Sequence, residues 1–264
     1  MLRFRFQILF LSLVVSGLIG SGPAAAQSVE SVVNTMQARY NKQIESVDTY
    51  IVETNLYTSY NKKVIQNGEP TYRTQTKMRG PNTTSFASTT TPSAAYGLQF
   101  DRLKTHAVYK GTETINGTQC HVLYVDDPSK VNAEMGSQAA SLTYFVDAER
   151  YVPTRMVMES RQSEQEGPQA SSVTINLKNY QTTDGLTLPY RMEIQLETNM
   201  SAQQRQQMQQ MMQQMENIPE AQRKRMEQMM GQQMNMIKQM LSGEPIVVEV
   251  QSVQVNTEIP NGIF

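Results

Sequence analysis

The sequence predicts a mainly β fold of the α+β class, built on a curved antiparallel sheet of about ten strands. Three observations support this class. From Thr49 to Thr198, apolar and polar residues mostly alternate with the period of two that half-buried strands show. Short turn signals separate these runs, which favours an antiparallel meander. Only two segments, one near residue 28 and one after residue 200, have helical spacing.

The first 26 residues have the pattern of a secretory signal peptide. Arg3 and Arg5 precede an apolar stretch at residues 8–19, and three alanines at 24–26 stand before Gln27. Because the stretch is short for a membrane span, we expect cleavage rather than an uncleaved anchor. No Cys follows the stretch, so lipidation of a mature N-terminal Cys is not expected. We therefore expect residues 1–26 to be removed and residues 27–264 to form one exported domain.

An amphipathic helix is expected over residues 28–47. Its apolar positions recur at intervals of three and four, which places them on one helix face: Val29, Val32, Val33, Met36, Tyr40 and Ile44. Residues 50–60 then predict a half-buried strand, one face of which carries Tyr50, Val52, Thr54, Leu56, Thr58 and Tyr60.

Turn chemistry delimits the later strands. Asn116-Gly117 is a two-residue hairpin signal, residues 126–128 end the strand that follows it, and Asp184-Gly185 joins two long strands. One face of the last of these is apolar throughout: Leu186, Leu188, Tyr190, Met192, Ile194 and Leu196. The other face holds Arg191, Glu193, Gln195 and Glu197. Residues 245–257 are expected to return to the same sheet.

These alternating strands predict an apolar interior beneath a helical cover. We expect seven side chains to line it, because each lies on the apolar face of its strand: Tyr50, Val52, Leu56, Leu188, Tyr190, Met192 and Ile194.

Residues 200–242 interrupt two strands and predict a helical hairpin. The segment holds 11 of the 18 Met and 13 Gln. Eight methionines lie at helical spacing on either side of Pro219: Met208, Met211, Met212 and Met215, then Met226, Met229, Met230 and Met234. Three interpretations remain open: plain packing, an adaptable apolar lid, and capture of a soft metal such as Cu(I). We expect the lid.

Composition and motifs argue against catalysis. One Cys excludes an intramolecular disulfide framework, and a net charge of −1 leaves no broad footprint for nucleic acid. Cys120 and His121 are neighbours on a strand, so their side chains point to opposite faces and cannot form a dyad. His106 and His121 are expected in separate strands without flanking carboxylates. No phosphate loop or hydrolase motif occurs. We expect no enzyme, no cofactor and no metal site.

Several motifs, taken in order, resemble the LolA/LolB-like outer membrane lipoprotein-sorting superfamily, including proteins related to LolA and to the lipid-sensing domain of RseB. They are Lys110–Gly117 leading into Cys120–Leu123, Tyr144–Asp147 with Val152–Met156, Tyr180 with Asp184–Pro189, and the ending Val255–Phe264. The resemblance implies a curved half-barrel whose concave apolar face is partly covered by helices and binds lipid or acyl chains. The absence of Trp and the insertion depart from LolA itself.

Together these features predict a non-enzymatic periplasmic protein that binds or carries lipid or lipoprotein acyl chains. We expect a monomer that binds no nucleic acid. Two alternatives stay open. One is an interaction or stress-sensing module that docks on an envelope partner through the Met/Gln hairpin. The other is periplasmic copper binding by the Met cluster.

Overall fold

The computed structural model describes residues 27–66, 69–79, 85–90, 99–132, 139–161, 170–198 and 242–264, together with residues 203, 206, 207 and 210. Its helices are α1 (Val29–Ile44), α2 (Phe100–His106) and the short 3-10 helix η2 (Pro128–Lys130). The strands, in chain order, are β1 (Thr49–Thr54), β2 (Tyr57–Gln66), β3 (Glu69–Met78), β4 (Ser85–Thr90), β5 (Ala107–Ile115), β6 (Thr118–Val125), β7 (Ala139–Asp147), β8 (Pro153–Ser160), β9 (Ala170–Thr183), β10 (Leu186–Thr198) and β11 (Ile246–Val255).

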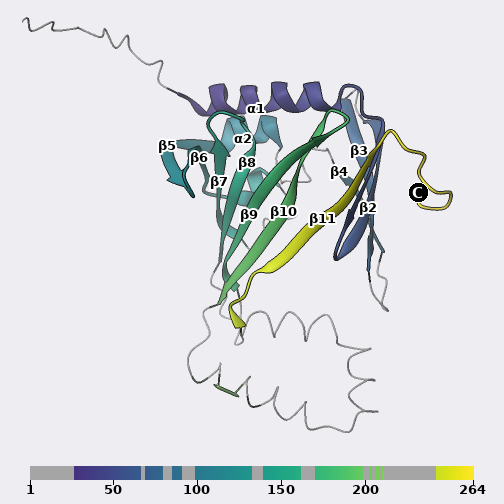
Figure 1. The fold of residues 1–264 in the computed structure, drawn as a ribbon. Coiled ribbons are helices and arrows are strands. Elements are labelled where there is room, and N and C mark those ends of the chain that lie inside the picture. The colour runs from purple at the N-terminus through teal and green to yellow at the C-terminus, as the bar shows by residue number, and fades with distance from the viewer. Residues whose placement is uncertain are drawn as a thin grey trace, which may run out of the picture.

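All eleven strands belong to one antiparallel sheet, in the order β4-β3-β2-β1-β11-β10-β9-β8-β7-β6-β5. The expected mainly β class is confirmed. β11 returns to this sheet, as residues 245–257 predict, and pairs with β1 on one side and β10 on the other. Figure 1 shows the sheet bent into an open half-barrel, in which β9–β11 form the front and β2–β4 turn back behind them.

Bulges give the sheet its curvature. The register shifts where Thr54 pairs with Val250 while Glu53 pairs with Ser252, so Gln251 is an extra residue in β11. A second bulge lies between Tyr109 and Thr112 of β5, where Gly111 has a φ of +102°. An extra residue bends its strand and strengthens the local twist, which curls an otherwise open sheet.

The expected N-terminal helix is confirmed, and a second helix joins it. All six apolar positions of α1 are buried or packed against buried residues of the sheet. α2 was not expected, and it places His106 at a helix end instead of in a strand. It has seven residues, and its buried side chains are Phe100 and Leu103. A pair spaced by three over so short a segment does not establish a helical period in the sequence. Within the described residues, no helix is long and apolar enough to cross a membrane.

The single strand expected over residues 50–60 is wrong, because the chain turns at Asn55 and Leu56 between β1 and β2. The buried Thr54 hydroxyl accepts hydrogen bonds from the Leu56 and Tyr57 N–H groups, at 3.1 and 2.9 Å. Local side-chain bonding of this kind competes with strand pairing and closes a turn. The sequence did not reveal this turn, because the alternation of residues over 50–60 continues across it.

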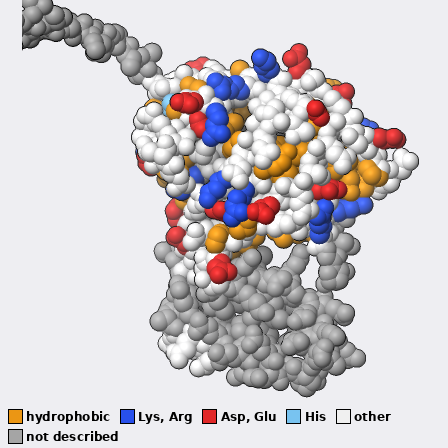
Figure 2. All heavy atoms as spheres, viewed as in Figure 1, with side chains coloured by type: hydrophobic (Ala, Val, Ile, Leu, Met, Phe, Trp, Pro, Cys, Tyr) orange, Lys and Arg blue, Asp and Glu red, His pale blue; other side chains and the backbone are white. Residues whose placement is uncertain are grey.

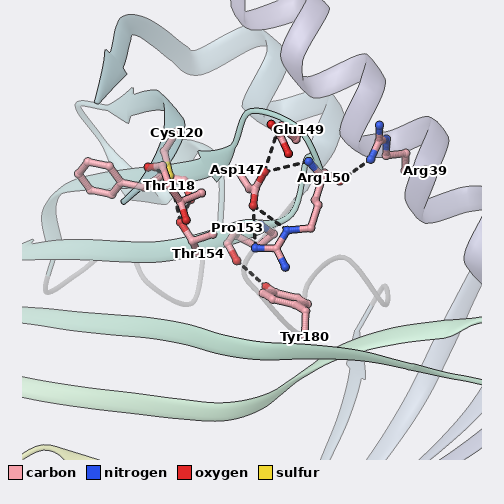
Figure 3. Close-up of polar contacts among 10 residues, drawn as sticks. Arg39, Thr118, Cys120, Asp147, Glu149, Arg150, Pro153, Thr154 and Tyr180 are labelled. Atoms are coloured by element: carbon pink, nitrogen blue, oxygen red, sulfur yellow. Dashed lines mark hydrogen bonds and ion pairs between the residues drawn. The ribbon is translucent and has the colours of Figure 1, made fainter. Parts of the chain in front are cut away.

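A polar cluster at the β7–β8 turn ties this part of the sheet to α1 (Figure 3). The Asp147 carboxylate accepts hydrogen bonds from the N–H groups of Glu149 and Arg150, both at 2.9 Å. It also pairs with the Arg150 guanidinium at 2.7 Å. From α1, Arg39 donates to the Arg150 carbonyl at 2.8 Å. Burial opposes ionisation of Asp147, but these hydrogen bonds outweigh it and hold the pKa of its carboxyl below the ordinary value.

Asp147→Asn is expected to destabilise the protein by about 1.5–3 kcal/mol at pH 7, the usual contribution of hydrogen bonds to a charged group. A lowered folded-state pKa adds stability above the unfolded value of about 4, and this stability is lost as the pH falls through the folded value. The difference between wild type and variant should therefore shrink below about pH 4. Urea unfolding at a series of pH values measures it. Asp126→Asn, at an exposed ion pair, is the control and should change little. A difference that does not depend on pH would contradict the assignment.

Candidate functional site

The inner face of the sheet, which faces α1 and α2, is apolar across most of its width. The registers of the strand pairs align one residue from each of seven neighbouring strands into a single row: Tyr109, Leu123, Tyr144, Met156, Ile175, Ile194 and Ile246. A second row lies beside it, composed of Ala107, Val125, Leu142, Met158, Val173 and Leu196. Every member of both rows is apolar, so β5–β11 present one continuous apolar surface.

Burial is uneven along these rows. Leu123 and Tyr144 are fully buried at 0% exposure, because α1 and α2 pack over β6–β8 in the same cluster. Farther along, on β9–β11, the row members are only half-buried. We name these half-buried residues the inner strip: Val173, Ile175, Ile194, Leu196 and Ile246. Because these residues are contiguous and none is fully covered, the inner strip is the candidate binding surface of the described residues.

The structure divides the seven expected interior residues among several places. Tyr50, Val52 and Leu188 belong to an apolar cluster around Ile44 at the end of α1. Met192 packs against the main cluster, opposite Leu177. These seven residues therefore do not meet in one cluster.

The remaining three expected residues lie elsewhere. Ile194 lies in the inner strip, where it faces Ile175. Tyr190 is half-buried and bonded through its hydroxyl to Thr183 at 2.9 Å. Leu56 lies in the β1–β2 turn rather than in a strand, for the reason given above.

Sequence reasoning missed most of the inner strip. Val173, Ile175 and Leu177 alternate in β9, and this alternation was a readable signal. What the sequence did not contain is the register that sets Ile175 opposite both Met156 and Ile194. Without the register, the strands that share the strip could not be identified.

Charged side chains occupy the outer face of the same strands, as the alternation of β10 predicts. Lys178 and Arg191 both contact the Glu193 carboxylate, at 2.6 and 2.8 Å, and Arg191 also pairs with Glu249. Hydrogen bonds from Lys178 and Arg191 lower the pKa of Glu193. Figure 2 shows blue and red side chains gathered on this face. Opposite charges alternate there, so the outer face is well solvated and carries no single sign.

Cys120 and His121 lie on opposite faces of β6, as expected. Cys120 is buried with Val122 and Phe145 in a small cluster on the outer face, and burial raises the pKa of its thiol. His121 is 3% exposed on the inner face, with Nδ1 3.1 Å from the Tyr109 hydroxyl. Burial lowers the pKa of His121. In the described part of the chain, no three His, Cys, Asp or Glu side chains are grouped to hold a metal.

The eight methionines expected in a lid, Met208, Met211, Met212, Met215, Met226, Met229, Met230 and Met234, lie outside the described residues. The same holds for the expected signal peptide at residues 1–26.

Because burial differs along the row, truncating its members should lower the free energy of unfolding by different amounts. Leu123→Ala should destabilise the protein by about 2–5 kcal/mol, because it leaves a cavity in the covered part. Ile194→Ala should cost about 1 kcal/mol, because the side chain is already partly in water. Val108→Ala, at an outer-face side chain that is 51% exposed, is the control. The free energy of unfolding in urea measures all three. Equal costs for Leu123→Ala and Ile194→Ala would show that the inner strip is as well covered as the core.

No family model matches the sequence, and no curated protein matches it. Solved structures similar to this chain include a domain described as an outer membrane lipoprotein-sorting protein from Vibrio parahaemolyticus. It is 10% identical, with 89% of this chain and 94% of that chain covered and a TM-score of 0.46. A DUF1329 family protein from Desulfovibrio piger is 9% identical, with 88% and 94% covered and a TM-score of 0.43. A LolA superfamily protein from Nitrosomonas europaea is 10% identical, with 90% and 98% covered and a TM-score of 0.37.

Proposed function

We propose that this protein binds the apolar chains of lipids on the inner strip and functions as a carrier or binding protein, not as an enzyme. The single observation that carries the proposal is the burial gradient along the seven-strand apolar row. One half of the row is covered by α1 and α2, whereas Ile175, Ile194 and Ile246 stay half-buried. The resemblance of the sequence to lipoprotein-sorting proteins supports the same ligand class.

Elementary energetics suit this role. An apolar chain that covers the inner strip removes apolar surface from water, at about 25 cal/mol per Å² or 0.8 kcal/mol per buried methylene. Part of this gain offsets the cost of association. A strip that covers one side of a chain gives reversible binding, which a carrier needs for release.

We place this activity in the periplasm. The pattern of residues 1–26, with Arg3 and Arg5 before the apolar stretch and small residues before Gln27, supports export. Among the cargo classes, lipoprotein acyl chains and free lipids present the same methylene chemistry to the inner strip.

Ile194→Asn and Ile246→Asn should each weaken binding of a pyrene-labelled long-chain fatty acid about tenfold or more, because an amide replaces several methylenes worth about 0.8 kcal/mol each. Fluorescence titration measures the dissociation constant. Val247→Asn is a matched control, because Val247 follows Ile246 in β11 but faces Glu193 on the outer side of the sheet. Far-ultraviolet circular dichroism confirms that each variant is folded. The proposal fails if the wild type does not bind the probe, or if Val247→Asn weakens binding as much as the inner variants.

A further inference from the structure

The inner face changes chemistry abruptly between β1 and β2. On β1 and β11, Val52 lies opposite Val253. One strand farther, Val52 lies opposite Ser59, and Ser59 lies opposite Thr76 of β3. In the adjacent row, Tyr50 is followed by Asn61 and then Thr74. We name Ser59, Asn61, Thr74 and Thr76 the polar wall.

The packing of Tyr72 fixes the side of the sheet on which the polar wall lies. Tyr72 is fully buried against Ile44 of α1 and Tyr50, and its hydroxyl donates to the Val47 carbonyl. Successive side chains of a strand alternate between faces, so Thr74 and Thr76 share the inner face with Tyr72. Figure 1 shows that β2 and β3 form one side of the half-barrel whose front is β9–β11. The polar wall and the inner strip therefore belong to the same interior.

Hydrogen bonds run through the polar wall in one direction. The Thr74 hydroxyl donates to the Asn61 side-chain oxygen at 2.8 Å. The Asn61 amide in turn donates to the Ser59 hydroxyl oxygen at 3.1 Å and to the Tyr50 carbonyl at 3.3 Å. Asn61 is 3% exposed, and these bonds use both of its side-chain N–H groups. The Ser59 oxygen already accepts a bond, so the hydroxyl proton of Ser59 is left to donate.

Two adjacent donors result. Among the interactions of the described residues, the Ser59 proton has no acceptor and the Thr76 hydroxyl has no partner. Ser59 and Thr76 are directly opposite each other in the β2–β3 ladder, and both are half-buried. Cβ atoms of such pairs lie about 5 Å apart, so one ligand group can reach both hydroxyls.

The polar wall offers no free charge. The one ammonium group of the described inner face of β2 and β3 is that of Lys63, and it is engaged by the Glu45 carbonyl at 3.1 Å and by Asp48 at 3.4 Å. Among the described residues of this wall, a carboxylate or phosphate would reach no free cation, whereas an uncharged oxygen acceptor would match the two hydroxyl donors. The wall therefore suits a neutral polar group.

We infer that the ligand of this interior is an amphiphile with an uncharged, ester-like oxygen group, which Ser59 and Thr76 bind while its chain lies along the inner strip. The inference rests on the proposed function, because the chain must occupy the strip. The polar wall lies in the row of Val253, and the strip begins at Ile246 of the same strand, so the chain crosses the interior obliquely, over several strands and along β11.

The test uses two pyrene-labelled probes of equal chain length, a fatty-acid methyl ester and an alkane without oxygen, with the full chain and fluorescence titration. The double variant Ser59→Ala/Thr76→Val removes both hydroxyls and keeps the shape of the Thr76 side chain. It should bind the ester about tenfold more weakly than wild type, because two hydrogen bonds are lost, and should bind the alkane unchanged. Thr58→Val is the matched control, because Thr58 neighbours Ser59 in β2 but lies on the outer face opposite Glu53.

The outcomes separate the two proposals. A loss of affinity for the ester alone supports the inference. If the double variant binds both probes like wild type while Ile194→Asn weakens both, the chain occupies the strip but the polar wall does not bind the oxygen, and only the inference is overturned. An equal loss with Thr58→Val also overturns it. If the wild type binds neither probe, the proposed function and the inference fail together. Circular dichroism and urea unfolding show whether the double variant is folded.

Discussion

The pairing of β11 with both β1 and β10 is the constraint on which the rest of this structure depends. β1–β4 and β5–β10 are each meanders of consecutive strands, and β11 alone joins them. Its contacts with β1 connect positions as far apart in sequence as Tyr50 and Val255. Asn256, the next residue, accepts a hydrogen bond from the Asp48 N–H and donates to the Ser46 carbonyl, so the end of β11 also fixes the turn that follows α1. Without β11, the polar wall and the inner strip would lie on separate sheets.

A sheet with one apolar face must cover that face, and this one does so only in part. α1 and α2 bury the rows over β6–β8, where Leu123 and Val125 have no exposed surface. The charged residues of β9–β11 lie on the outer face, so the inner strip lies on the apolar side of these strands. Complete coverage would add stability at about 25 cal/mol per Å², but it would leave no apolar surface for a ligand. The incomplete cover is therefore consistent with a protein that exchanges an apolar ligand.

The two chemistries of the interior complement each other physically. An apolar strip holds a methylene chain without regard to its position along the strip, because hydrophobic burial is not directional. Hydrogen bonds are directional, and the chain from Thr74 through Asn61 to Ser59 orients the terminal donor. Neutral hydroxyls contribute modestly to affinity, which favours a ligand that is positioned and then released.

The sequence by itself determined the strand class, the N-terminal helix with its buried face and the inward-facing side of β10, because each is a local period that follows from backbone geometry. It could not reveal α2, since seven residues show too few repeats of a helical period. It also could not divide residues 50–60 into β1 and β2, because the turn depends on hydrogen bonds of the Thr54 hydroxyl. Only the tertiary structure decided which inward residues stay half-buried and that Ser59 lies beside Thr76. Register and helix cover arise from contacts between residues far apart in the chain, and no local pattern encodes them.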